Sequence, residues 1–177
     1  MSAAHCHLDP RVWGDDAGVD AVIARAREAG VVGMIAIGSG YGFESADRAV
    51  AVAMRHPDVR AAVGLHPHDA KDATTERLAD LFALAGRPEV VGVGEMGLDY
   101  HYDNSPREEQ RSAFRDQLAA AREIGKPIII HDRESGGETL TLLDEARAWD
   151  QGVMFHCYTG DVAMMEAIVA RGGHVSI

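Results

Sequence analysis

The sequence contains very little cysteine and no long apolar run. Only Cys6 and Cys157 occur among 177 residues, and they form no Cys-x-x-Cys metal-binding pair, which suits a reducing compartment. No apolar stretch reaches the roughly 20 residues needed to cross a bilayer, and the N-terminus lacks the basic and apolar segments of a secretory signal. We therefore expect a cytoplasmic protein without membrane contact, and we expect both thiols to be buried and inert.

Basic residues are also scarce. The 17 lysines and arginines stand against 28 aspartates and glutamates, which gives a formal net charge of −11. A surface this acidic repels a polyanion at long range, so a protein that coats nucleic acid through phosphate contacts is disfavoured. An enzyme that acts on nucleic acid is disfavoured only mildly, because bound divalent cations and a few arginines can reverse the field locally.

Short β-branched apolar runs alternate with amphipathic segments along the whole chain. The runs predict strands at residues 3–8, 31–37, 60–65, 89–94, 127–130, 152–155 and 174–177, and the segments between them predict helices at 18–29, 43–55, 74–85, 106–124, 137–148 and 161–171. The clearest helix has a predicted capping box from Ser105 to Glu108 and a terminating Gly125.

This alternation indicates an α/β protein, either a doubly wound open sheet or a barrel. The first predicted strand ends in His-Cys-His-Leu-Asp and lacks the glycine-rich phosphate loop of a Rossmann sheet. Polar residues instead follow many different strands, and barrels build their active sites at the carboxyl ends of their strands. We therefore predict a (β/α)8 TIM-type barrel.

The predicted strands number seven, whereas a typical barrel has eight strands and about 250 residues. Unpaired first and seventh strands would be open edges, which proteins normally avoid. We therefore expect residues 1–177 to form a single barrel domain that lacks the last helix, strand and helix.

His5 and His7 are alternate residues of the first predicted strand. Alternate side chains of a strand face the same side, about 6.5–7 Å apart, so both imidazoles should point into the barrel mouth and could grip one cation. A His-x-His pair alone is a weak signal, and a structural or chance pair explains most isolated examples.

Three further residues strengthen that signal: Glu95, His131 and His156 each follow a buried apolar run. A charged group in such a position costs several kcal/mol unless it is paired or bound to metal. Ligand types on four strands at one rim favour a metal site over four satisfied core residues. Four imidazoles and a central carboxylate suit two nearby divalent ions, with Glu95 placed to bridge them. Nitrogen ligands of this softness bind Mn²⁺ or Zn²⁺ better than Mg²⁺, although abundant Mg²⁺ could be used.

At this point the chain resembles the TatD family of metal-dependent deoxyribonucleases, a family of amidohydrolase-like barrels. The matching stretches lie in family order along the chain. They are His5-Cys6-His7-Leu8-Asp9, Gly64-Leu65-His66-Pro67-His68, Gly92-Val93-Gly94-Glu95-Met96-Gly97-Leu98-Asp99-Tyr100, Asn104-Ser105-Pro106-Arg107-Glu108-Glu109-Gln110, Ile130-His131-Asp132-Arg133 and His156-Cys157-Tyr158-Thr159-Gly160.

The resemblance implies that His5, His7 and Glu95 hold one metal and that Glu95, His131 and His156 hold the second. It implies a hydrolase that cleaves phosphodiester bonds by metal-activated water, as a 3′–5′ exonuclease on single-stranded DNA, with RNA left open as a second substrate. In the family, an aspartate on the last strand completes the first metal site. The sequence ends before that strand, which bears on whether this chain is catalytically competent.

Several neighbouring residues have two interpretations. The resemblance places His66 near the scissile phosphate as a catalytic and substrate-binding residue, whereas for His68 a loop hydrogen bond is equally favoured. Arg133 could hold a phosphate through its planar fork or form a salt bridge at the rim. Tyr100 could stack on a base, although packing of its loop, shared with Asp99, is the default. Asp9 could orient a ligand histidine.

Two other functions remain open at this stage. One is a small-molecule amidohydrolase acting on an amide, ester or lactone, which would often use a carbamylated lysine as bridging ligand. Neither Lys71 nor Lys126 lies at the carboxyl end of a predicted strand, which favours the nuclease. The other is a non-catalytic metal-binding barrel. No stable protein partner is indicated, and a monomer is the default expectation.

Overall fold

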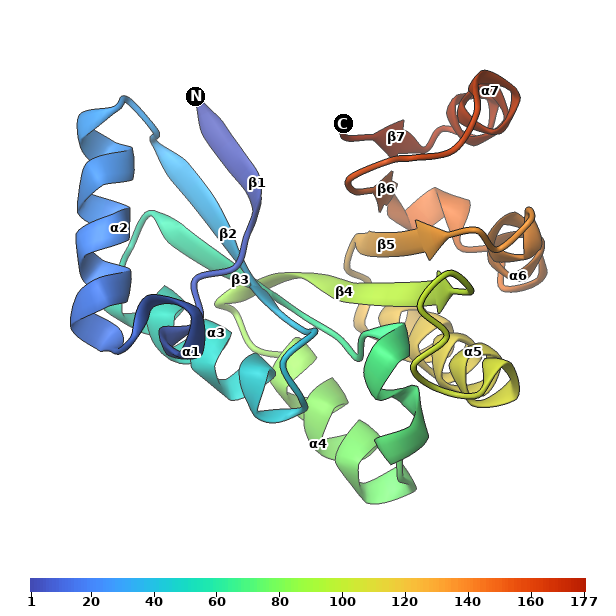
Figure 1. Ribbon diagram of the computed structural model, residues 1–177, viewed down its shortest axis with the longest axis horizontal. Helices are drawn as coiled ribbons and strands as arrows, with labels where there is room; N and C mark the ends of the chain where they lie inside the picture. Colours follow the sequence, from blue (N-terminus) through green and yellow to red (C-terminus); the bar gives the residue numbers. More distant parts are fainter.

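The fold is a curved sheet of seven parallel strands with helices on its outer side. The computed structural model describes residues 1–177, and the strands neighbour one another in chain order from β1 to β7 (Figure 1). The strands are β1 (Ser2–Cys6), β2 (Gly33–Gly38), β3 (Val59–Val63), β4 (Val90–Asp99), β5 (Ile128–Arg133), β6 (Val153–Phe155) and β7 (His174–Val175).

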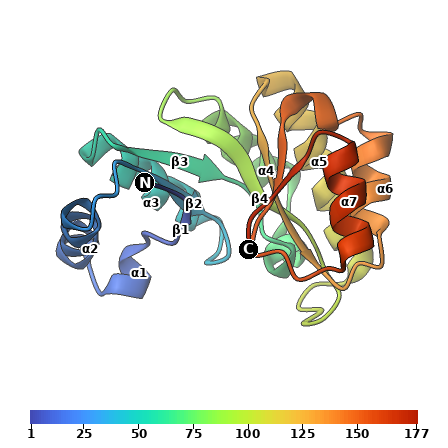
Figure 2. The same cartoon turned by 90° about the horizontal axis from the view of Figure 1, so that it is seen from above.

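Each strand is followed by helical structure before the next one begins, as βα crossovers in a parallel sheet require. The α-helices are α1 (Pro10–Trp13), α2 (Asp16–Glu28), α3 (Glu44–Arg55), α4 (Thr75–Ala85), α5 (Arg107–Ile124), α6 (Glu138–Glu145) and α7 (Val162–Ala170), with 3-10 turns η1 (Pro67–Asp72) and η2 (Trp149–Gln151). Figure 2 shows α5, α6 and α7 side by side on one flank of the sheet.

The apolar core separates into two unequal parts. A cluster of 34 buried residues fills the space between the sheet and the helices. A second cluster, of Ile37, Ala62 and Ile129, lies on the other face of β2, β3 and β5. Because successive strand residues point to opposite faces, Ala36 joins the large cluster and its neighbour Ile37 joins the small one. This two-faced burial is typical of a barrel wall and confirms the predicted barrel-type α/β fold.

The sheet remains open within these residues. β1 pairs only with β2 and β7 pairs only with β6, and Figure 1 shows the two edge strands facing each other with no strand between them. A barrel without its last unit has this arrangement. That a further helix, strand and helix would close it stays a prediction. None of the helices combines the length and apolar character that crossing a membrane requires.

Most predicted elements are present, but one predicted helix cap is wrong. Gly125 ends α5 in the left-handed conformation, as expected, and its N–H donates to the Ala121 carbonyl. Ser105 does not cap that helix, which begins at Arg107 without a side-chain cap. The Ser105 hydroxyl instead donates to the His68 carbonyl over 2.7 Å and accepts from the Lys71 N–H over 3.1 Å. It therefore fastens η1 to the start of α5.

Candidate metal centre

Glu95 lies within β4, where the strand carries an irregularity in its pairing with β5. Val93 pairs with Ile128 and Met96 with Ile130, so β4 contains one extra residue at this point. Such a bulge re-aims a side chain. The prediction that the strand ends before Glu95 is therefore wrong, because β4 continues to Asp99. The bulge places a carboxylate that is 3% exposed at the centre of the site.

Two glycines make this path of β4 possible. Gly94 and Gly97 have φ of 137° and 142°, values that side-chain-bearing residues rarely adopt. A Cβ on Gly94 would lie 2.3 Å from the Ile129 carbonyl oxygen, and one on Gly97 would lie 2.0 Å from that of His131. The Gly94-Glu95-Met96-Gly97 spacing in the sequence is thus a requirement of close approach between β4 and β5.

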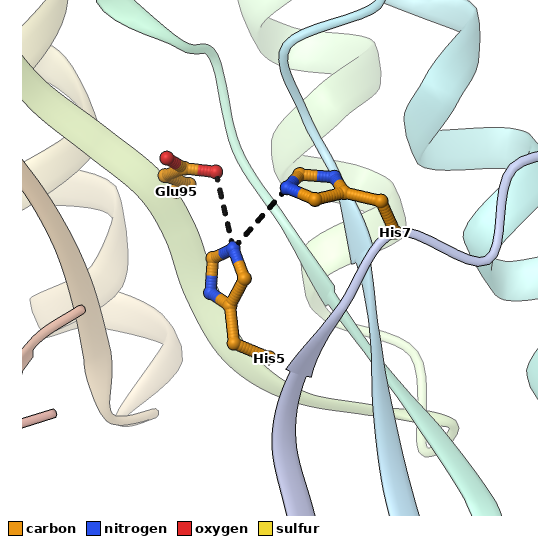
Figure 3. A group of neighbouring side chains, drawn as sticks. All are labelled: His5, His7 and Glu95. Carbon is orange, nitrogen blue, oxygen red and sulfur yellow. Dashed lines mark hydrogen bonds and ion pairs between the residues drawn. The ribbon is translucent and has the colours of Figure 1, made fainter. Parts of the chain in front are cut away.

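His5, His7 and Glu95 form the first donor group (Figure 3). The two Nε2 atoms lie 3.3 Å apart, and His5 Nε2 lies 3.6 Å from Glu95 Oε2. Their ligand atoms all fall within 4.8 Å of one another. The sequence placed both histidines within one strand that continues to residue 8, and this extent is wrong. β1 ends at Cys6, so His7 lies beyond it, free to turn its ring towards His5.

His66, Glu95 and His131 form a second group around the other carboxylate oxygen. His131 Nδ1 lies 3.0 Å from Glu95 Oε1, and His66 Nε2 lies 3.5 Å from the same oxygen. His66 follows β3 and is 6% exposed. Because Oε2 belongs to the first group and Oε1 to the second, the Glu95 carboxylate is shared between them.

His156 lies next to both groups. Its ring stacks on that of His5 at a centroid distance of 4.0 Å, and its Nε2 lies 2.5 Å from Glu95 Oε1. The two atoms are not oriented for a hydrogen bond, so the buried Nε2 of His156 has no hydrogen-bond partner. A nitrogen and a carboxylate oxygen crowded in this way suit a shared cation. The five predicted ligand residues are therefore brought together, and a set of imidazoles around one carboxylate fits a divalent ion such as Mn²⁺ or Zn²⁺.

Asp99 is a site residue that the sequence interpretation left as loop packing. It ends β4 fully buried, and its Oδ2 lies 2.9 Å from His131 Nε2 and 3.0 Å from His68 Nε2. Carboxylates commonly hold the far nitrogen of a metal-ligating histidine in this way. Its position four residues after Glu95 on an apolar strand was the available signal. Ser39, also missed, donates from its hydroxyl to Glu95 Oε2 over 3.2 Å.

The electrostatics of the site keep Glu95 ionised. Burial alone raises the pKa of this carboxyl, but His131, His156 and His66 around it outweigh burial and hold the pKa well below its usual range. Burial also lowers the pKa of His5 to about 4 and lowers the pKa of His66. The uncharged form of His5 is thus favoured at neutral pH, and a neutral imidazole is the form that binds metal.

The structure also describes Asp9 and the two cysteines, for which separate expectations followed from the sequence. Asp9 does not orient a histidine, which corrects that interpretation, because it pairs with Arg48 at 2.8 Å and caps α1 through the Arg11 N–H. Cys6 is partly buried as a free thiol, but Cys157 is exposed, so the expectation of burial is wrong for Cys157. The residue has φ of 45° in the connection after β6, where the chain turns outward.

The two predicted substrate-binding residues away from the carboxylate lie at the mouth. The Tyr100 hydroxyl donates to Glu138 over 2.6 Å, and the Arg107 guanidinium covers its ring at 4.2 Å. Packing accounts for these contacts, and stacking of a base on Tyr100 stays a prediction. Arg133 forms no salt bridge; its guanidinium lies 5.3 Å from the centre of the Tyr102 ring.

Comparison with known proteins agrees with this geometry. Residues 4–177 match the family model described as TatD related DNase. The chain is 38% identical to a metal-dependent hydrolase of Bacillus subtilis, YabD, over 97% of its own length and 66% of that protein's. It is 40% identical to the 3′-5′ ssDNA/RNA exonuclease TatD of Cronobacter turicensis, over 89% of this chain and 59% of that one.

Among solved structures, the TatD homologue YjjV of Escherichia coli superposes with a TM-score of 0.87 at 29% identity, covering 99% of this chain and 66% of YjjV. The chain thus spans between 59% and 66% of the length of these three relatives. The family match extends over nearly every residue and includes all the ligand-type residues of the site. The chain belongs to the TatD family.

Proposed function

We propose that Glu95 bridges two divalent cations, with His5 and His7 completing one site and His131 and His156 completing the other. The observation that carries this proposal is the shared carboxylate, whose two oxygens each face a separate set of imidazole nitrogens. Aspartate or glutamate bridges of this kind are common where two metals lie a few ångströms apart.

Hydrogen bonds support this division of the histidines. His131 Nε2 faces the Asp99 carboxylate, so its proton belongs on Nε2 and its Nδ1 lone pair points to Glu95. In His66 the other ring nitrogen faces the centre. Its Nδ1 accepts the His68 N–H over 3.1 Å, so the proton of the neutral ring is on Nε2, the atom that faces Glu95. His66 therefore offers an N–H to the centre of the site and suits a phosphate oxygen better than a metal.

The reaction that fits this site is hydrolysis of a phosphodiester. Divalent cations bound there would lower the pKa of a water molecule and offset the negative charge of the phosphate. Around them, the His66 N–H and the Arg133 guanidinium would hold the phosphate oxygens, and Asp99 would keep the His131 ring in one orientation. The names of the TatD relatives direct us to single-stranded DNA or RNA, shortened from the 3′ end.

An amidohydrolase with a carbamylated lysine is less well supported. Lys126 Nζ donates to the Ala85 and Arg87 carbonyls over 2.6 and 2.7 Å. Lys126 comes just before β5 begins, so it lies at the amino ends of the strands, whereas the donor residues lie towards their carboxyl ends. Lys71 Nζ is held by the Asn104 carbonyl at 3.1 Å. With both lysines engaged elsewhere, Glu95 is the bridging group that the structure offers.

Degradation of a 5′-labelled single-stranded oligonucleotide tests the proposal. The purified chain would be assayed with Mg²⁺, with Mn²⁺ and with EDTA, together with Glu95→Gln, His66→Gln and the control His174→Gln. His174 is exposed and is the first residue of β7, the last strand of the sheet. We expect a metal-dependent ladder of products shortened at the 3′ end in the wild type and the control, and none with Glu95→Gln. A folded, metal-loaded wild type that leaves DNA and RNA intact would contradict the proposal.

A further inference from the structure

Tyr102 is the exposed aromatic side chain nearest the donor groups on the connection between β4 and α5. It is 57% exposed, and its ring centre lies 5.6 Å from that of His68, which in turn lies 4.3 Å from that of His66. Its hydroxyl has no hydrogen-bond partner in the protein, in contrast to that of Tyr100. An exposed aromatic ring beside a phosphodiesterase site is suited to stack on a base.

The position of Tyr102 is fixed by the same carboxylate that holds a metal ligand. Asp99 Oδ1 accepts the backbone N–H groups of Tyr102 and His101 over 2.9 and 3.1 Å, while Asp99 Oδ2 lies against His131. One fully buried side chain therefore sets both the ligand ring and the loop that carries Tyr102. Rigid support of this kind is typical of a residue that binds rather than of a loose surface tyrosine.

Arg133 adds an unpaired cation to this aromatic ring. Its guanidinium stacks on Tyr102 and makes no hydrogen bond or ion pair. The carboxylates on either side of it in sequence are engaged elsewhere: Asp132 accepts the Thr139 hydroxyl over 2.5 Å, and Glu134 pairs with His101 at 2.8 Å. In a chain of net charge −11, a free guanidinium beside the metal donors is available for a phosphate.

A cavity of about 660 Å³ continues from Arg133 between the connections that follow β5 and β6. Its lining includes Arg133, Gly136, Gly137 and Thr159, together with the carboxylates of Asp132, Glu134 and Asp161. A nucleotide is small enough for such a space, which is within the usual size range of small-molecule pockets. The cavity therefore has room for one nucleotide beside Arg133, which is the single cation of a lining with three carboxylates.

From these contacts we infer that Tyr102 and Arg133 form a nucleotide subsite next to the metal donors. Tyr102 stacks on one base of the strand, and Arg133 binds the phosphate beside it, at the entrance to the cavity. This inference rests on the proposed function. It assigns base stacking to Tyr102, which is 57% exposed, instead of Tyr100, whose ring lies 4.2 Å from the Arg107 guanidinium and whose hydroxyl donates to Glu138.

The test combines protein variants with modified oligonucleotides. Binding of a fluorescein-labelled oligonucleotide would be measured by anisotropy in EDTA, where no metal-dependent cleavage occurs, and kcat and KM would be measured with Mn²⁺. We expect Tyr102→Ala to weaken binding and raise KM about 5- to 100-fold, as expected for loss of one stacked base, and Tyr102→Phe to bind like the wild type. A single abasic nucleotide at the stacked position should remove the difference between Tyr102→Ala and the wild type.

Arg133→Met is tested in the same way with oligonucleotides that carry one uncharged methylphosphonate linkage. Its binding defect should disappear when the linkage that Arg133 contacts is the modified one. The matched control is Arg147→Met, because Arg147 is likewise unpaired but is exposed and follows α6, away from His131 in the chain.

The outcomes separate this inference from the proposed function. If the wild type cleaves the oligonucleotide but Tyr102→Ala binds as tightly as the wild type, or its defect is the same at every abasic position, the subsite is wrong and the nuclease stands. If the wild type neither binds nor cleaves the oligonucleotide, both are wrong. Metal content measured for each variant shows that an observed binding defect does not arise from a damaged metal centre.

Discussion

His131 Nε2 lies 2.9 Å from Asp99 Oδ2, while Nδ1 of the same ring lies 3.0 Å from Glu95 Oε1. The imidazole is thus held between two carboxylates on one strand, one fully buried at the end of β4 and one at its bulge. This arrangement directs the Nδ1 lone pair towards the centre of the site. Asp99 would thus orient a proposed ligand without being one of the proposed ligands itself.

The first prediction concerns this contact. Asp99→Asn should weaken the metal site that contains His131 by about 10- to 100-fold, the usual effect of losing the carboxylate partner of a ligand histidine. The site formed by His5 and His7 should change much less. Calorimetric titration with Mn²⁺ measures both affinities. Equal weakening of the two sites, or no change in either, would contradict this role of Asp99. Glu134→Gln, which alters an exposed pair with His101, is the control.

A second prediction concerns the close approach of β4 and β5. Gly97→Ala should unfold the protein or lower the free energy of unfolding by at least about 3 kcal/mol, because the strained φ alone costs about 1–3 kcal/mol and the new Cβ would collide with the His131 carbonyl. Gly136→Ala has a positive φ but open space around it, so only the strain cost should appear. Urea unfolding of both variants measures the difference; equal losses would show that the collision is relieved.

A third prediction concerns pH. Burial lowers the pKa of His5 to about 4 in the folded chain, against about 6.5 when unfolded. Between these values the unfolded chain binds a proton at His5 that the folded chain does not bind, so this residue makes unfolding easier as pH falls through the window. Its contribution to the free energy of unfolding rises with pH from 4 to 6.5 and is constant above.

Urea unfolding of the EDTA-treated protein at pH 5 and pH 7.5 checks this sign. His5→Asn should lose less stability than the wild type on going to pH 5, whereas His174→Asn, which replaces an exposed histidine, should follow the wild type. A steeper loss for His5→Asn than for the wild type would contradict the assignment.

A fourth prediction separates Asp9 from the metal centre. Asp9→Ala removes the cap of α1 and leaves Arg48 without its partner, which should cost about 2–4 kcal/mol of stability. Because Asp9 contacts no histidine of the site, metal affinity should be unchanged. A large loss of Mn²⁺ affinity in a folded Asp9→Ala protein would restore the interpretation that Asp9 orients a ligand.

The sequence was sufficient to predict the barrel-type fold, because buried parallel strands are continuous apolar runs and several of these runs are followed by a polar residue at the carboxyl end of the strand. It did not reveal the bulge in β4, since the extra residue at Glu95 changes the pairing with β5 and leaves the apolar pattern intact. The positions of Asp99 and Tyr102 depend on that path. A strand expected to end at residue 94 therefore left Asp99 in a loop, where packing was the default interpretation.

Local signals were also ambiguous where tertiary contacts compete with them. Ser105 has a capping sequence, yet its hydroxyl joins η1 to α5. Asp9 shares a strand pattern with His5 and His7, yet Arg48 on α3, which lies far away in sequence, neutralises it. In both cases a partner that no local pattern identifies determines what the side chain does.

The bridging role of Glu95 is tested most directly by metal titration of the folded chain, followed by elemental analysis and Mn²⁺ electron paramagnetic resonance. We expect two Mn²⁺ ions per wild-type chain with an exchange-coupled spectrum, one ion in His5→Gln and in His131→Gln, and loss of both from Glu95→Gln. A single uncoupled ion in the wild type, or two ions retained by Glu95→Gln, would contradict it.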